Sequence, residues 1–191
     1  MKRIFIAALV LCATITRAQD AEATTTATVE KSIFNVQTGF LGLYANNEYG
    51  LSSHIALRTE IGLEPGFTVR PDDSEWALLP MVNLEPRYYY NIEKRAGKGR
   101  NVSGNAASFF TIGVRCNPGV TLYATRDDYK MATFLAFIPK WGIRRNIGNS
   151  NFNYEAGLGI GYYTLLGDDK KYYDKTSDVA VDLHLRIGYR F

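Results

Sequence analysis

The chain is poor in cysteine, histidine and proline, and these scarcities exclude several kinds of protein. Its 191 residues include two Cys, two His and six Pro. Cys12 lies in an apolar stretch at the start of the chain, so Cys116 has no partner for an intramolecular disulfide once that stretch is removed. We therefore expect no disulfide framework, no metal site and no reactive thiol, and no cofactor is implied.

The first 18 residues, MKRIFIAALVLCATITRA, have the pattern of a secretory signal peptide. Lys2 and Arg3 precede a short apolar region, and Ala18 is the small residue expected before the cleavage site. The apolar region is too short to cross a bilayer as a helix. We expect export and cleavage near Ala18; a buried N-terminal strand and lipid attachment at Cys12 are weaker alternatives.

Removal of residues 1–18 also removes three bases and no acid, which leaves 19 bases against 19 acids. A neutral chain argues against nucleic acid as a partner. Residues 19–31 are small and polar and predict a flexible leader. The remaining residues, 32–191, have the length of one domain.

Apolar and polar residues alternate with a period of two through most of that domain. The last thirteen residues, VAVDLHLRIGYRF, place apolar side chains at every odd position from Val179 to Phe191. Such alternation is the signature of a β-sheet with two different faces. No stretch keeps a helical period of 3.6 residues, so the sequence predicts an all-β fold.

Three features favour a transmembrane barrel over a soluble sandwich. Most of the predicted strands are about ten to sixteen residues long, whereas strands in globular proteins average about five or six. Glycine is frequent in the polar rows, which suits a narrow interior. Aromatic residues gather near the predicted strand ends, as they do at membrane interfaces. We therefore expect apolar rows that face lipid and polar rows that line the interior of an outer-membrane barrel.

The alternation predicts eight strands, joined in an up-and-down antiparallel order. They are placed at 33–44, 52–64, 76–91, 106–116, 119–125, 130–145, 151–166 and 178–191. An even number puts both chain ends on one side. With the ends in the periplasm, the outer loops are 45–51, 92–105, 126–129 and 167–177, and the inner turns are 65–75, 117–118 and 146–150. A bulge at Asn117–Gly119 would instead reduce the count to seven.

The close of the chain, LHLRIGYRF, resembles the C-terminal signature of Gram-negative outer-membrane proteins, in which the assembly machinery recognises a terminal Phe, here Phe191. EPRYYYNIEKRAGKGRNVSGNAASFF and IPKWGIRRNIG resemble segments of a family of small outer-membrane β-barrel proteins. The resemblance spans roughly residues 33–191 and implies an eight-stranded barrel similar to OmpA and OmpX. It carries no catalytic motif.

The inward rows contain bases and acids in near-equal numbers, which predicts a ladder of ion pairs because buried charge is costly unless it is paired. The predicted members are Arg58, Glu60, Glu64, Glu85, Arg87, Arg115, Lys140, Arg144, Glu155, Asp182, Arg186 and Arg190. Side chains can fill an eight-stranded barrel. We expect a plugged, structural lumen, with a narrow ion channel as the alternative.

The two histidines have different expected roles. His184 lies on an inward row, where a hydrogen bond to a neighbouring carboxylate is expected. His54 lies beside Ser52 and Ser53, the pairing that a lipid-modifying acyl transferase or hydrolase needs. The sequence offers no clear third residue to orient His54, so we expect no enzyme and keep the lipid-modifying enzyme as the rival.

The predicted loop 92–105 carries four bases, Lys94, Arg95, Lys98 and Arg100, against one acid. Outside the cell these bases are candidates for contact with lipopolysaccharide phosphates, and a solvated loop is the alternative. The sequence as a whole predicts a monomeric outer-membrane protein with a structural or interactive role. Its expected partners are outer-membrane lipid, lipopolysaccharide and the assembly machinery.

Overall fold

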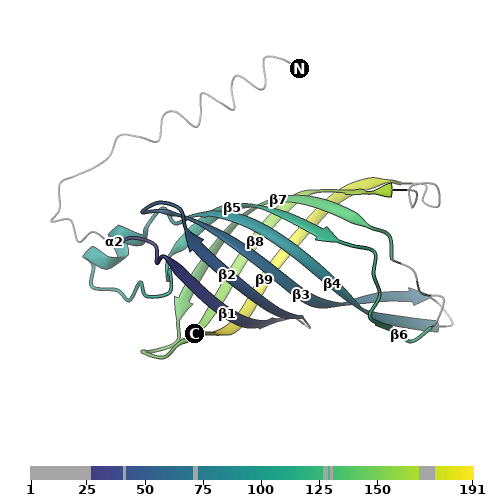
Figure 1. Cartoon of the computed structure of the whole chain (residues 1–191), viewed down its shortest axis with the longest axis horizontal. Helices are drawn as coiled ribbons and strands as arrows, with labels where there is room; N and C mark the ends of the chain where they lie inside the picture. The colour runs from purple at the N-terminus through teal and green to yellow at the C-terminus, as the bar shows by residue number, and fades with distance from the viewer. Residues whose placement is uncertain (1–26, 41, 71–72, 127–128, 130, 168–174) are drawn as a thin grey trace, which may run out of the picture.

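The computed structural model describes residues 27–40, 42–70, 73–126, 129, 131–167 and 175–191. Long antiparallel strands wind around a common axis (Figure 1). The elements are β1 (Ser32–Gly39), β2 (Leu43–Gly50), β3 (Ile55–Arg70), β4 (Asp73–Tyr88), α2 (Ile92–Gly97), β5 (Ser108–Asn117), β6 (Tyr123–Ala124), β7 (Phe134–Asn146), β8 (Phe152–Leu165) and β9 (Ser177–Arg190). No helix in these ranges is long and apolar enough to cross a membrane.

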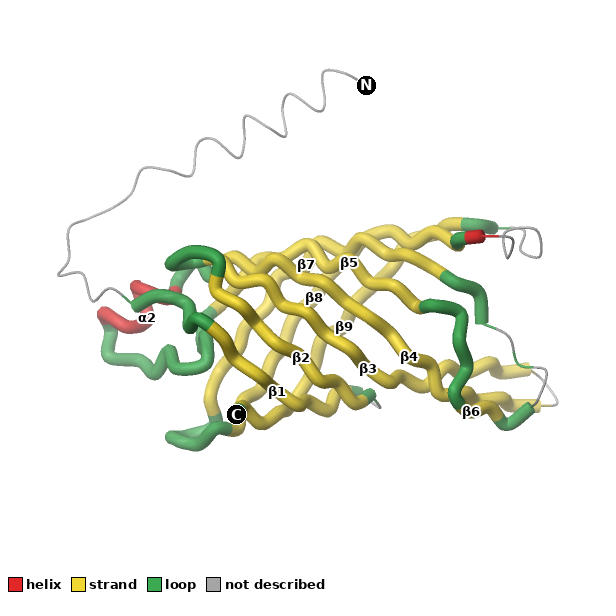
Figure 2. Tube along the Cα trace, viewed as in Figure 1, coloured by secondary structure: helices red, strands yellow, loops and turns green. Residues whose placement is uncertain are grey.

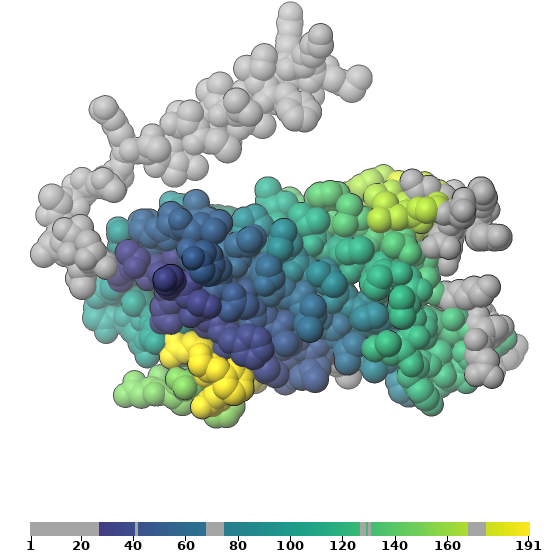
Figure 3. All heavy atoms as spheres, viewed as in Figure 1, coloured from purple at the N-terminus to yellow at the C-terminus, as the bar shows by residue number. Residues whose placement is uncertain are grey.

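Eight of the strands close into a barrel. β1, β2, β3, β4, β5, β7, β8 and β9 each pair antiparallel with the next. β9 returns to β1 through the register Asn35↔Arg190 to Gly39↔Arg186, which brings the start and the end of the described chain side by side (Figure 3). β6 is an extra strand that pairs with Ala77 and Leu78 of β4. The predicted all-β, eight-stranded antiparallel barrel is thus confirmed.

The two faces of the barrel have opposite chemistry. On β9, Val181 is 65% exposed and Leu183 is 72% exposed, whereas His184 is 2% exposed. The same contrast recurs on β8, where Leu158 and Ile160 are exposed and Glu155 is buried. Because neighbouring residues of a strand point to opposite faces, period-two alternation sends the apolar row outward and the charged row inward.

The strands differ strongly in length. β1 and β2 have 8 residues each, whereas β3 and β4 have 16 each. The β1–β2 hairpin turns between Gly39 and Leu43, where the Gly39 backbone NH donates to the Gly42 carbonyl at 3.0 Å. The hairpin therefore ends partway along the barrel, while β3, β4 and β7 to β9 continue beyond it (Figure 1).

Two predicted strands are wrong, and their errors cancel in the count. The segment 33–44 is not one strand but β1, the turn and the start of β2, so the predicted outer loop 45–51 is mostly strand. Of the predicted strand 119–125, only Tyr123 and Ala124 are strand, and they form the extra β6. The inner turn expected at 65–75 instead belongs largely to the β3–β4 hairpin, whose register runs to Arg70↔Asp73.

The predicted grouping of the loops by side is also wrong. Residues 89–107, which join β4 to β5 and include α2, lie at the same end of the barrel as both ends of the described chain (Figure 2). The opposite end holds the described residues of 118–133, the end of β8 and the start of β9. Loops 92–105 and 167–177 are predicted to share a side, but loop 92–105 and the described residues of 167–177 lie at opposite ends.

The predicted signal peptide, residues 1–18, lies outside the described residues, as does most of the predicted leader, 19–31. The last part of that leader packs against the barrel. Val29 is buried, and its NH donates to the Ser53 carbonyl at 2.9 Å. The Glu30 NH donates to Asn105 Oδ1 at 2.8 Å.

Candidate functional site

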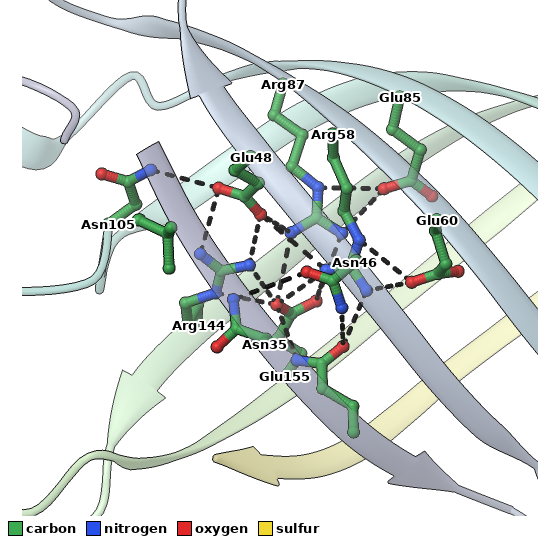
Figure 4. Close-up of polar contacts among 12 residues, drawn as sticks. Asn35, Asn46, Glu48, Arg58, Glu60, Glu85, Arg87, Asn105, Arg144 and Glu155 are labelled. Atoms are coloured by element: carbon green, nitrogen blue, oxygen red, sulfur yellow. Dashed lines mark hydrogen bonds and ion pairs between the residues drawn. The ribbon is translucent and has the colours of Figure 1, made fainter. Parts of the chain in front are cut away.

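The interior of the barrel holds a cluster of charged side chains near the end where the described chain begins and ends. The ion pairs link five cations with five anions, contributed by β2, β3, β4, β7, β8 and β9. The members of this charged cluster are Glu48, Arg58, Glu60, Glu85, Arg87, Lys140, Arg144, Glu155, Asp182 and Arg186. Figure 4 shows most of them converging from different strands toward one another.

Glu155 of β8 is one centre of the cluster. Arg58 Nη1 donates to its two carboxylate oxygens at 3.0 and 3.1 Å. Arg144 Nε donates to the same carboxylate at 2.7 Å, and Arg87 Nη2 at 3.2 Å. His184 Nε2 lies 2.8 Å from Oε2, which is the carboxylate contact that the sequence predicts for this histidine. Three arginines thus share one fully buried carboxylate.

Glu48 of β2 is the second centre. Arg87 Nη1 and Arg144 Nη1 each donate to it at 3.1 Å, and the Tyr89 hydroxyl donates at 2.8 Å. Burial raises the pKa of the Tyr89 phenol, which keeps its proton available for this bond. The Asn105 side-chain amide completes the set at 3.1 Å.

The remaining cluster members extend the network along the barrel. Lys140 Nζ lies 2.6 Å from Glu85 Oε1 and 2.9 Å from Asp182 Oδ2. Arg186 Nη1 donates to Glu60 at 2.6 Å. Every charged side chain in the cluster has at least one partner of opposite sign, so the group is balanced, and all of its members except the half-buried Asp182 are buried. Balance matters because an unpaired charge in such surroundings costs several kcal/mol, on the order of 3–5.

An apolar layer covers the cluster at this end of the barrel. Val29, Tyr89, Ile92 of α2 and Phe109 of β5 are all buried and pack together with Ala56 and Ala107. The Arg87 guanidinium carbon lies 4.1 Å from the centre of the Phe109 ring, where the ring attracts a cation. Together the layer and the cluster fill this half of the interior with side chains.

The loop that follows α2 is held directly against the cluster. The Gly104 carbonyl accepts from Arg144 Nη1 at 3.0 Å, and Asn105 adopts a left-handed backbone conformation with φ of 56°. Asparagine tolerates this conformation better than most residues do. The conformation accompanies two hydrogen bonds of the Asn105 side chain, from the Glu30 NH and to Glu48.

Most of the twelve residues predicted to form the ladder belong to the charged cluster, but three lie apart from it. Arg115 pairs with Glu64 further along the barrel. Arg190 lies at the end of β9, where its Nη1 is 3.7 Å from Glu30. The sequence reasoning missed Glu48, because it assigned residues 45–51 to a loop. The polar row Asn35, Gln37, Asn46 and Glu48 was the available signal.

The four bases of the predicted loop do not act as one patch. Arg95 donates from Nε to the Ala106 carbonyl at 2.8 Å and so stabilises the loop. Lys94, Lys98 and Arg100 are exposed. Their contact with lipopolysaccharide stays a prediction. The predicted topology puts these bases and the chain ends on opposite sides of the membrane, whereas in the structure they lie at the same end of the barrel.

The loop between β2 and β3 contains an arrangement that the sequence did not reveal. Ser53 Oγ lies 2.9 Å from His54 Nδ1, and His54 Nε2 lies 3.4 Å from Glu93 Oε1. Glu93, from α2, is placed to orient His54, a role for which the sequence offered no clear residue. All three side chains are accessible to solvent.

No protein-family model, no curated protein and no solved structure matches the chain. The resemblance to the OmpA and OmpX barrels therefore stays a prediction, and the finding is the eight-stranded barrel itself. Within the described ranges, no group of three or more His, Cys, Asp or Glu is placed to hold a metal ion.

Proposed function

We propose that this protein is an outer-membrane β-barrel, exported by its first 18 residues, with a structural or interactive role. One observation carries the proposal: the apolar rows face outward and the charged rows face inward. A row such as Val181, Leu183, Leu185 and Ile187, each more than half exposed, is unfavourable in water and favourable in lipid. In this role the barrel supports the envelope and presents its loops to lipid or to a partner.

The height of the apolar belt fits a bilayer. From Val179 to Tyr189, β9 rises about 33 Å at roughly 3.3 Å per residue, which at a tilt of about 40° spans about 25 Å. Exposed aromatic residues lie toward the two ends of the barrel. The rings of Trp76 and Tyr123 lie 5.0 Å apart in a tilted contact at one end, and Trp141 donates to the Tyr90 hydroxyl at 3.0 Å toward the other. Such bands are typical of membrane interfaces.

Depth-dependent fluorescence quenching tests this proposal. The chain has two tryptophans, so replacing both by Phe and adding Leu183→Trp gives a single probe on the middle of the belt. In vesicles of brominated phosphatidylcholine, deep bromines should quench this probe most strongly. A probe introduced by Asn149→Trp, in an exposed loop, is the control and should respond weakly at all depths. Equal quenching of the two probes would contradict a membrane-spanning barrel.

The charged cluster supports a plugged interior over the alternative of a narrow channel. Arg58, Arg87, Arg144, Glu48 and Glu155 are at most 1% exposed, and the apolar layer lies over them. A conducting path would need these ion pairs to separate. We expect planar-bilayer recordings of the purified protein to show no reproducible unitary conductance. Discrete conductance steps would favour the channel.

A lipid-modifying enzyme is a second candidate, favoured by the Ser53–His54–Glu93 contacts alone. A serine nucleophile needs a base, and the base needs a group that orients it. If the site is active, His54→Ala and Ser53→Ala should each change the phospholipid or lipid A profile of the host membrane, whereas Ser150→Ala should not. Unchanged profiles in both variants would remove this candidate.

A further inference from the structure

The wall of the barrel is incomplete beyond the β1–β2 hairpin. The pairing of β9 with β1 stops at Gly39↔Arg186, and that of β2 with β3 stops at Leu43↔Leu63. Among the described residues, no backbone pairing joins β9 residues 177–185 to β3 residues 64–70. Pro65, which has no NH to donate, lies on this part of β3. The two strand edges therefore border a lateral opening.

Two cavities lie at this opening, with volumes of about 350 and 430 Å³. The first is bordered by Phe40, Tyr44, Glu64, Phe67 and the run Val181–Arg186. Besides Arg115, the second is lined by Met131, Ala132, Phe134, Ala136, Ile138, Tyr163, Leu165, Lys175 and Val179–Val181. Arg115 and Val181 line both, so the cavities adjoin; we call them together the side chamber. Each has the size of a small-molecule site.

The side chamber reaches from the interior through the wall. A cavity confined to the interior would touch only every second residue of a strand. Here six consecutive residues of β9, Val181–Arg186, line the first cavity, and both inward Glu64 and outward Phe67 of β3 do so. Both faces of both edges are therefore in contact with the same space. Outward neighbours such as Leu183 and Leu185 make its mouth apolar.

The chamber combines an apolar lining with an incompletely satisfied cation. Ala132, Phe134, Ala136, Ile138 and Leu165 supply the apolar wall of the second cavity. Arg115 pairs through Nη2 with Glu64, but its buried Nε has no hydrogen-bond partner among the described residues. Glu64 is already engaged on its other oxygen by the Tyr44 hydroxyl at 2.7 Å. A buried donor without a partner is destabilising, so a ligand oxygen that accepts from it would be stabilising.

We propose that the side chamber binds a single-chain amphiphile with a carboxylate head, of the fatty-acid class. The carboxylate accepts from Arg115, and the alkyl chain lies against the apolar wall of the second cavity or leaves through the opening between β9 and β3. The charged cluster fills the barrel interior toward the end where the described chain begins and ends. The chamber is therefore closed on that side and does not form a passage through the barrel. The inference extends the proposed function, because it takes a bilayer beside the opening as the source of the amphiphile.

Photo-crosslinking tests the inference. The full-length protein is reconstituted in phosphatidylcholine nanodiscs and irradiated with a diazirine analogue of palmitate, and the labelled peptides are mapped by mass spectrometry. We expect label in residues 131–138 and 179–185, displaced by palmitate but not by hexadecan-1-ol, which lacks the carboxylate. Label spread over the outward belt, or equal competition by the alcohol, would overturn the proposal.

Two pairs of variants sharpen the test. Ala136→Trp fills the second cavity and should reduce labelling at least tenfold, whereas Ile160→Trp, on the outward face, should not. Arg115→Gln should weaken palmitate binding roughly tenfold to hundredfold, the range for one charge-assisted hydrogen bond. Its control, Arg100→Gln at the opposite end, should bind as the wild type does. Unchanged binding in Arg115→Gln would overturn the proposal even if Ala136→Trp failed to fold.

Failure of the side-chamber proposal can be distinguished from failure of the membrane proposal. Depth-dependent quenching of the Leu183→Trp probe reports whether the belt lies in lipid, and it does not depend on any ligand. A belt that is quenched by deep bromines together with no displaceable label would refute the side chamber alone.

Discussion

Replacing Glu155 by Gln is the sharpest perturbation of the charged cluster. Glu155 accepts hydrogen bonds from Arg58, Arg87, Arg144 and the Gln37 side chain, and it is 1% exposed. Gln has nearly the same shape but no charge. The variant therefore keeps the packing and leaves five cations against four anions in the cluster.

The expected loss is about 3–5 kcal/mol of unfolding free energy, the cost of removing one partner from a buried ion pair. This is a large share of a typical total stability of about 5–15 kcal/mol. The double variant Glu155→Gln/Arg144→Gln restores the balance of charge. We expect its loss of unfolding free energy to be smaller than the sum of the losses of the two single variants, with a coupling energy of about 0.5–3 kcal/mol or more.

Urea titration of the protein folded into phospholipid vesicles measures these differences, with tryptophan fluorescence as the signal. Glu93→Gln, at an accessible position in α2, is the matched control and should stay within about 0.5 kcal/mol of the wild type. The reasoning is refuted if Glu155→Gln lies within about 1 kcal/mol of the wild type, or if the two substitutions are additive.

Three further predictions concern topology, packing and assembly. A membrane-impermeant maleimide on intact cells should label only one of Lys98→Cys and Val120→Cys, because the two loops lie at opposite ends; labelling of both would contradict the topology. Gly161→Val should destabilise the barrel by about 1–3 kcal/mol in the same urea titration, because a Cβ there meets the Phe137 carbonyl of β7. Phe191→Ala should lower the amount of folded protein in the outer membrane, measured by fractionation, while refolding in vesicles stays close to the wild type.

The faces of the strands could be predicted because the period of two is a direct consequence of strand geometry. Val181 and His184 follow the row to which the sequence assigns them. The β1–β2 turn could not be found in the same way. Its residues between Gly39 and Leu43 include Phe40 and Leu41, so the apolar pattern of a strand continues through the turn. Gly39 and Gly42 are the only turn-forming residues here, and no Asn, Asp, Ser or Pro accompanies them between β1 and β2.

Proline caused the opposite error, a predicted turn where the structure has a strand. Pro65 and Gly66 indicate a turn, yet both are paired within the long β3–β4 hairpin. Pro65 is tolerated on β3 because the strand has lost its β2 neighbour two residues earlier. Elsewhere the ladder adapts: the β4–β5 pairing has a break at Pro86, and the β7–β8 pairing has one at Pro139. Proline, which has no NH to donate, is therefore compatible with a strand at positions where one of the two neighbouring strands is not paired.

The charged cluster could be predicted as a kind of site but not as an arrangement. Inward charge of both signs follows from the rows. The pairing of Arg58 of β3 with Glu155 of β8 joins residues 97 apart in sequence. That contact depends on barrel closure and on the tilt of each strand, which a single sequence does not specify. The missed Glu48 shows the consequence, because one wrong strand boundary removed a central carboxylate.

The cluster also explains how so short a seam between β1 and β9 can close the barrel. The seam pairs only Asn35–Gly39 with Arg186–Arg190. Across the interior, however, Gln37 of β1 accepts from Arg58 at 2.7 Å and donates to Glu155 at 3.1 Å, which ties β1 to strands that are not its neighbours. A one-residue slip of β1 would turn Gln37 outward, against the apolar belt, and leave Arg58 and Glu155 short of a partner. Register is therefore specified where the cluster lies. Beyond Gly39, no strand among the described residues pairs with this edge of β9, and the wall is open there.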